Sequence, residues 1–281
     1  MAAKGQPSKH LAARGLSPTT NSSEIADPAS ESPLERYIRV LENVSLSNDG
    51  LSVSEVAAAC NFPVVTAHRL VSNLHRVGVL QTAGSTRKHY QFGQRLLRLL
   101  HAGHDRVKLA IAVQPVLDAL ADKLANTCFL ARLAGSQVVS VAWAVPGDGL
   151  SGYVIPGHSL PAHAAAGAKA ILAVQSEALR DDALRLPLKK LADQTLTSRD
   201  AVEREYARVR KRGYATCWNE IENGLGAIAV PIEVPGAGVI YSVGTAGLTE
   251  RVYRRTENET VEMLRSAVAA LTHAVARAAP L

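Results

Sequence analysis

Residues 32–93 constrain the fold most, because they carry the start and stop signals of three short helices followed by a hairpin. Ser32 and Ser52 are each followed three residues later by a glutamate. In this pattern a serine hydroxyl and a carboxylate together cap the first turn of a helix. A third helix is predicted over 64–77, before Gly78, which can adopt the left-handed conformation that ends a helix.

Two short β segments, 79–82 and 88–92, flank a polar and basic tip. Three helices followed by such a hairpin describe a winged helix-turn-helix, whose third helix fits the DNA major groove while the hairpin reaches flanking phosphates. Winged helices also serve as protein–protein modules, but the basic tip and the polar outer helix face favour DNA. The candidate DNA-binding residues are Thr66, His68, Arg69, Ser72, Asn73, Arg87 and Lys88.

The rest of the chain is too long to share one core with this unit. A length of 281 residues suits one small and one medium domain. Apolar residues make up 47% of the chain and aromatic residues 4%, so the cores must be mostly aliphatic. The net charge of +6 permits an anionic partner without identifying one. Three widely spaced cysteines indicate neither a disulfide framework nor a zinc site.

Several segments are predicted from composition and periodicity. Residues 1–31 are rich in Ser, Pro and Ala without apolar periodicity, which is typical of a disordered tail. Residues 94–125 predict connecting helices, with a break near Gly103 and a new helical run beginning at Pro115. The leucine-rich faces of these helices exceed what one helix can hide and therefore predict a partner surface, most simply that of a symmetric dimer.

Residues 126–279 alternate strand and helix patterns, beginning with a β-hairpin over 127–145. A helix is predicted from His163, another ends at Gly213, and a terminal helix begins near Glu257. This alternation predicts an α+β sensor-like domain in which a sheet and one helix enclose a small cavity. The chain shows neither a secretory signal nor a membrane span, so we expect a cytoplasmic protein.

Catalytic and metal-binding interpretations find weaker support. His101 and His104 with Asp105 form a possible metal corner, but no third ligand follows at a recognisable spacing. Ser159 beside His163 suggests a nucleophile, yet the glycine-flanked serine turn of a hydrolase is missing. We therefore expect no enzyme activity, no catalytic residue, no metal and no cofactor.

The chain resembles the IclR family of bacterial transcriptional regulators over nearly its whole ordered length. The resemblance rests on the order and spacing of these stretches: Leu34–Tyr37, Phe62–Leu70, Tyr90–Gly93, Leu160–Lys169, Lys211–Tyr214, Glu220–Gly224 and Ala229–Ile232.

This resemblance implies four segments: a tail over 1–31, a winged helix-turn-helix over 32–93, a dimerisation linker over 94–125, and a GAF-like α/β effector-binding domain over 126–279. It implies a homodimer or homotetramer on a palindromic double-stranded DNA operator, with half-sites roughly 34 Å or a multiple apart. It also implies a small-molecule effector, often an organic or aromatic acid. Glu220 would then have a structural or effector-loop role.

The family's pocket positions, carried over one by one, are Ala166, Gly167, Cys217, Leu225, Ala227, Ser242 and Gly244. We add Trp143 and Tyr153 from the neighbouring strand and loop. The chain departs from the family pattern at Ala227, where a cysteine is common, and at Cys217, near which an acidic residue is common. We expect a ligand held by backbone N–H groups, Ser242 and apolar contact.

A second departure lies in the third helix, where Val64 and Val65 replace the family's usual Lys-Ser and predict a shallower salt dependence of DNA binding. The leading hypothesis is an effector-responsive, sequence-specific regulator, associated with the nucleoid through its operator. One alternative keeps the DNA binding but has a degenerate, non-responsive pocket. The other is an enzyme that uses the sensor cavity.

Overall fold

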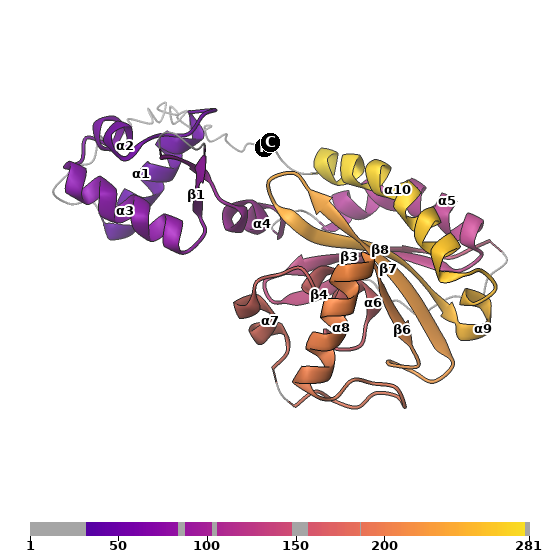
Figure 1. The fold of residues 1–281 in the computed structure, drawn as a ribbon. Coiled ribbons are helices and arrows are strands. Elements are labelled where there is room, and N and C mark those ends of the chain that lie inside the picture. The colour runs from indigo at the N-terminus through magenta and orange to yellow at the C-terminus, as the bar shows by residue number, and fades with distance from the viewer. Residues whose placement is uncertain (1–31, 84–87, 103–105, 148–156, 186, 279–281) are drawn as a thin grey trace, which may run out of the picture.

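The computed structural model describes residues 32–83, 88–102, 106–147, 157–185 and 187–278. The predicted tail over 1–31, the predicted break near Gly103, and His104 with Asp105 lie outside these ranges. Within the described residues, every helix is too short or too polar to cross a membrane. The chain forms a helical N-terminal unit and a larger C-terminal α/β unit, joined by α4 (Figure 1), as the predicted fold class requires.

The N-terminal unit has its own core. Ser32 and Ser52 both make the predicted reciprocal cap with a glutamate three residues later. The helices bury an aliphatic cluster that includes Val40, Val56 and Leu70. The elements of the unit are α1 (Pro33–Ser45), α2 (Val53–Cys60), α3 (Val64–Arg76) and a hairpin of β1 (Leu80–Ala83) and β2 (His89–Phe92).

The linker consists of α4 (Gln94–Ala102) and α5 (Arg106–Leu124). The prediction of a new helical run at Pro115 is wrong, because this proline lies inside α5. Tertiary packing outweighs the lost backbone hydrogen bond here. Leu109, Val113 and Leu117 are fully buried, and Gln114 donates from Nε2 to the carbonyl oxygen of Trp143 at 3.1 Å.

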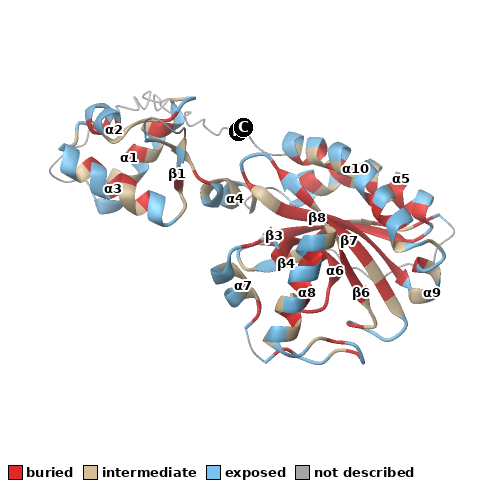
Figure 2. Cartoon of the chain, in the orientation of Figure 1, coloured by how far each residue is buried: buried red, intermediate tan, exposed pale blue. Residues whose placement is uncertain are grey.

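The C-terminal unit is built on a six-stranded antiparallel sheet with the order β5-β4-β3-β8-β7-β6. Its central strands are almost wholly buried (Figure 2). The strands are β3 (Thr127–Ala134), β4 (Gln137–Ala144), β5 (Ser159–Leu160), β6 (Ala215–Trp218), β7 (Leu225–Val234) and β8 (Gly238–Leu248). β8 continues to Leu248 because it stays paired with β7 as far as that residue.

Helices cover both faces of this sheet. α5 and α10 lie side by side on one face, while α6 and α8 lie on the other (Figure 1). The helix predicted from His163 begins at Ala166, and the His163 ring nitrogen Nε2 instead meets the carbonyl oxygen of Lys189 at 2.9 Å. The helices are α6 (Ala166–Leu172), α7 (Glu177–Ala183), α8 (Arg199–Arg212), α9 (Thr249–Val252) and α10 (Glu257–Ala278).

Candidate DNA-binding surface and effector pocket

The open face of α3 carries most of the residues predicted to contact DNA. Ala67, Leu70, Val71 and Leu74 bury one side of this helix in the core of the N-terminal unit. His68 and Arg69 are exposed on the other side, and Thr66 and Ser72 are half-buried at its edges. A helix held by its apolar face in this way presents its polar groups to a groove without losing its support.

Asn73 differs from the other candidates on α3. Its Nδ2 donates to the Tyr37 hydroxyl at 2.8 Å, and Arg76 donates to its Oδ1 at 3.3 Å. The amide is therefore engaged within the domain, where it ties α3 to α1. Asn73 therefore has a positioning contact within the domain, and its role in DNA binding stays a prediction.

Two further features frame the surface. Lys88 is exposed immediately before β2, while Arg87 lies outside the described residues. Val64 and Val65, adjacent in the first turn of α3, are 58% and 82% exposed. The departure from a Lys-Ser pair therefore places apolar groups at the end of α3 that a recognition helix directs to bases.

A second site is a small apolar pocket between α6 and the β6–β7–β8 edge of the sheet, with a volume of about 60 Å³. Five of the predicted pocket residues line it: Ala166, Gly167, Cys217, Leu225 and Ala227. Sequence reasoning missed Phe129, Leu160, Ala165, Ile221, Gly226, Ala246 and Gly247. Phe129 gave no signal of its own, because its place in the wall depends on the pairing of β3 with β8.

Ser242 and Gly244 lie behind this wall and not in it. The Ser242 hydroxyl is fully buried and donates to the carbonyl oxygen of Gly167 at 2.9 Å, so it fastens α6 to β8. Gly244 lies beneath the Phe129 ring, and a Cβ at this glycine would come within 2.5 Å of Cζ. Ser242 is not part of the lining and its hydroxyl hydrogen is already donated to Gly167, so a contact between Ser242 and a ligand stays a prediction.

The two residues that we added to the family positions do not extend the pocket. Trp143 pairs with Phe129 across β4 and β3 but is not part of the lining. Tyr153 lies outside the described residues.

A buried ion pair lies next to the pocket and was not predicted. Lys169 of α6 is fully buried, and its Nζ donates to both carboxylate oxygens of Glu220, at 2.6 and 2.7 Å. Burial raises the pKa of the neighbouring Cys217 thiol to about 11; the charge of Glu220 adds to this shift and that of Lys169 opposes it. Both residues fall in stretches that carried the family resemblance, but nothing in their spacing of 51 residues showed that they pair.

The described residues contain no group of three or more His, Cys, Asp or Glu side chains able to hold a metal ion. Cys217 is the nucleophilic side chain that lines the pocket, and its raised pKa keeps it a protonated thiol near neutral pH. The pocket as built is suited to holding an apolar group.

Comparison with known proteins bears on both sites. Residues 33–84 match the IclR helix-turn-helix domain, and residues 101–273 match the bacterial transcriptional regulator IclR C-terminal domain. The probable transcriptional regulator SauR of Cupriavidus necator is 30% identical over 199 residues, which cover 70% of this chain and 78% of that protein. The Pca regulon regulatory protein of Pseudomonas putida is 26% identical over 230 residues, covering 81% and 78%.

Solved structures agree with these matches. An IclR homolog from Microbacterium hydrocarbonoxydans, complexed with 4-hydroxybenzoate, is 26% identical with a TM-score of 0.55 and covers 88% of this chain and 100% of its own. A putative IclR regulator from a Silicibacter species is 25% identical with the same TM-score, covering 86% and 95%. The chain therefore belongs to the IclR family of transcriptional regulators, with a helix-turn-helix DNA-binding domain and an IclR effector-binding domain.

Proposed function

We propose that this regulator binds a palindromic DNA operator as a homodimer or homotetramer, and that a small organic acid changes this binding. The observation that carries the proposal is the face of α3, where His68 and Arg69 are exposed on a helix whose opposite face is buried. Exposed donors on a supported helix are what the reading of base edges in the major groove requires. Such binding would place the protein in the cytoplasm, on the nucleoid.

The exposed valines of α3 suggest how this helix recognises the base sequence of the operator. The C5-methyl group of thymine is the apolar feature of the major groove. We propose that the methyl groups of Val64 and Val65 pack against thymine. This contact would replace phosphate contacts that a Lys-Ser pair makes, so the affinity should fall less steeply with salt than for a relative with that pair.

The pocket supports an acid with an apolar body. Phe129, Ile221 and the small residues around them provide apolar contact, and a relative with 26% identity has been crystallised with 4-hydroxybenzoate. Lys169 supplies a positive charge beside Cys217, at present neutralised by Glu220. We propose that the carboxylate of the ligand competes with Glu220 for Lys169.

The volume of the pocket sets a condition on this proposal. About 60 Å³ holds roughly two water molecules, so an aromatic ring requires a wider cavity. Ile221 is 36% exposed, and its outward movement would widen the pocket. The same small volume favours the second candidate, a DNA-binding regulator whose pocket no longer responds to a ligand. Catalysis in the cavity gains no support from the protonated Cys217.

Footprinting of the DNA upstream of the gene and its neighbours, at two salt concentrations, tests the DNA-binding proposal. We expect one protected palindromic site that persists at the higher concentration. Diffuse protection that disappears with salt would contradict sequence-specific binding by the protein alone.

Thermal unfolding with a panel of small acids, including 4-hydroxybenzoate, tests the effector proposal. A ligand at one hundred times its Kd should stabilise the protein by about 2.7 kcal/mol. Stabilisation by an acid, together with a changed footprint, would support a responsive pocket. A protein that binds its operator but is stabilised by no acid would support the degenerate pocket.

A further inference from the structure

A second and larger pocket lies at the far end of the effector domain from α1–α3, where α9 and the turn after it face the end of α5 (Figure 1). Its volume is about 320 Å³, which falls within the range of small-molecule sites. The lining residues are Leu124, Ala125, Asn126, Arg251, Arg254 and Arg255. Half of them are arginines, in contrast with the apolar wall of the effector pocket.

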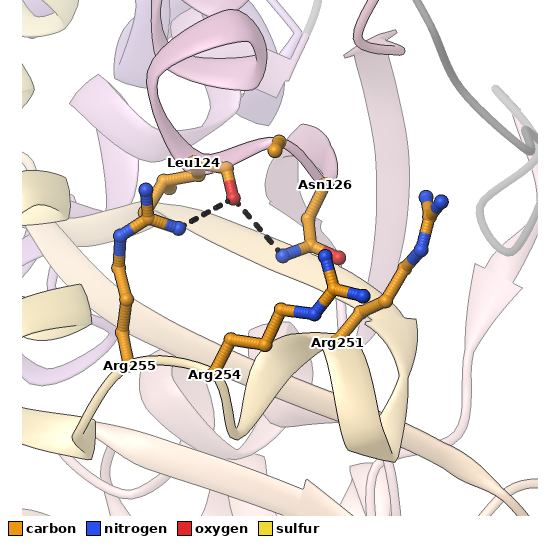
Figure 3. Close-up of a pocket in the computed structure, with 6 residues that line it drawn as sticks. Leu124, Asn126, Arg251, Arg254 and Arg255 are labelled. Atoms are coloured by element: carbon orange, nitrogen blue, oxygen red, sulfur yellow. Dashed lines mark hydrogen bonds between the residues drawn. The ribbon is translucent and has the colours of Figure 1, made fainter.

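Arg255 caps the C-terminal end of α5. Its Nη1 donates to the carbonyl oxygen of Leu124 at 3.0 Å, and its Nη2 donates to that of Lys123 at 3.1 Å. These carbonyl groups end α5 and have no partner within the helix, so a guanidinium there satisfies them. Asn126 donates to the same Leu124 oxygen at 3.1 Å and completes a fixed floor (Figure 3).

Arg251 and Arg254 make no such capping hydrogen bonds among the described residues. Arg254 extends from the turn after α9 toward Asn126, while Arg251 extends from α9 along the outer side of the pocket (Figure 3). Among the described residues, neither guanidinium has a hydrogen bond or an ion pair with a carboxylate. Two like charges thus lie beside one cavity without an ion-pair partner among the described residues, above a floor in which Arg255 and Asn126 Nδ2 both donate to the Leu124 oxygen.

We propose that this arginine pocket binds a small anion with at least two negative charges, carried by phosphate or carboxylate groups. The planar fork of a guanidinium matches the oxygens of either group with two parallel hydrogen bonds. Arg251 and Arg254 would each take one charged group, while Arg255 holds the floor. DNA is a less suitable source of this anion, because α9 lies at the opposite end of the molecule from α3 (Figure 1).

The site adjoins the effector pocket without being part of it. Asn126 forms its floor and packs so closely on Gly247 that a Cβ there would come within 2.5 Å of Oδ1. Gly247 lines the effector pocket on the other side. The proposal is independent of the acid suggested for that pocket, although one contact joins the two cavities.

Isothermal titration of the full-length protein with inorganic phosphate, pyrophosphate and citrate, at constant ionic strength, tests this proposal. We expect saturable binding of at least one anion at one site per chain. The double variant Arg251→Gln/Arg254→Gln should raise its Kd about tenfold or more, because it removes charged hydrogen-bond donors. Tighter binding of pyrophosphate than of citrate would identify the ligand as a phosphate compound. Tighter binding of citrate would identify it as a polycarboxylate.

The matched control is Arg185→Gln/Arg277→Gln, which removes two exposed arginines far from the pocket in sequence. It should leave the Kd unchanged. Equal losses in the two double variants would show a general effect of net charge and overturn the proposal, as would the absence of saturable binding to the unmodified protein. A loss of operator affinity in Arg251→Gln/Arg254→Gln, without any anion binding, would assign the arginines to DNA instead.

Discussion

The DNA-binding unit and the effector domain place their polar side chains in opposite ways. In the first, His68 and Arg69 lie on the surface of α3, supported by an aliphatic core. In the second, Lys169 and Ser242 are fully buried and bonded to partners distant in the sequence. The surface of the first unit can change with little effect on its fold, whereas polar groups in the second hold the fold together.

The largest expected effect is the loss of the buried ion pair. Lys169→Met should lower the free energy of unfolding by about 3–5 kcal/mol, because the buried Glu220 carboxyl loses its ion-pair partner. Tryptophan fluorescence during urea unfolding measures this selectively, since both tryptophans, Trp143 and Trp218, lie in the effector domain.

The double variant Lys169→Met/Glu220→Leu is the control for that measurement. It removes both charges and should recover much of the lost stability, since apolar side chains can replace a buried pair without large cost. A double variant as unstable as Lys169→Met would show that the loss comes from packing and not from the unpaired charge.

A smaller loss is expected from a methyl group beneath the pocket. In Gly244→Ala the new Cβ would lie 2.5 Å from Phe129 Cζ and 2.7 Å from the backbone oxygen of Ile228, and the strand backbone cannot move away easily. We expect a loss of about 1–3 kcal/mol in the same unfolding experiment. Gly147→Ala, which meets nothing within 4 Å, is the matched control and should unfold like the original protein.

On the DNA-binding side, Arg69→Ala should separate binding from folding. If Arg69 contacts a base, operator affinity should fall by about 1–3 kcal/mol, or roughly ten- to a hundredfold. The unfolding transition should not change, because the side chain is exposed. Gel-shift titration measures the affinity, with Arg277→Ala on α10 as the charge control. An unaltered affinity in Arg69→Ala would remove this residue from the proposed interface.

The contrast between the two regions also explains what could be predicted. The caps at Ser32 and Ser52 and the buried stripe of α3 depend on neighbours within four residues, so the sequence pattern alone was sufficient to predict them. The engagement of Asn73 with Tyr37 depends on a contact 36 residues away and was missed.

The effector domain shows the same limit more strongly. Five pocket residues could be transferred by resemblance, but Ser242 could not be distinguished from a lining residue. Its hydroxyl donates a hydrogen bond to the carbonyl oxygen of Gly167, which is 75 residues away in the sequence. The helix start predicted at Pro115 is wrong for a similar reason: a proline locally favours a break in a helix, but the packing of α5 against the sheet overrides this preference. The structural roles of these residues depend on contacts that are distant in the sequence, which the local pattern of a single sequence does not reveal.

The smallest expected effect tests whether the two regions are also separate in stability. Ser52 Oγ accepts a hydrogen bond from the Glu55 backbone N–H at 3.3 Å, and Ser52→Ala should lose about 1 kcal/mol by removing this cap. Ser45→Ala, at an exposed serine that does not cap an N-terminus, is the control. Helical circular dichroism should show an earlier transition only in Ser52→Ala.

Tryptophan fluorescence in the same Ser52→Ala samples then decides the question. An unchanged fluorescence transition would mean that the N-terminal unit unfolds independently, as its separate core suggests. A fluorescence transition that moves together with the dichroism signal would mean that α4 couples the two units, through contacts such as the bond from Arg98 Nε to the Ala237 carbonyl oxygen at 3.1 Å. In that case α4 could transmit a structural change at the effector pocket to the DNA-binding helices. Arg98→Ala, which removes this hydrogen bond, should then make the two units unfold independently.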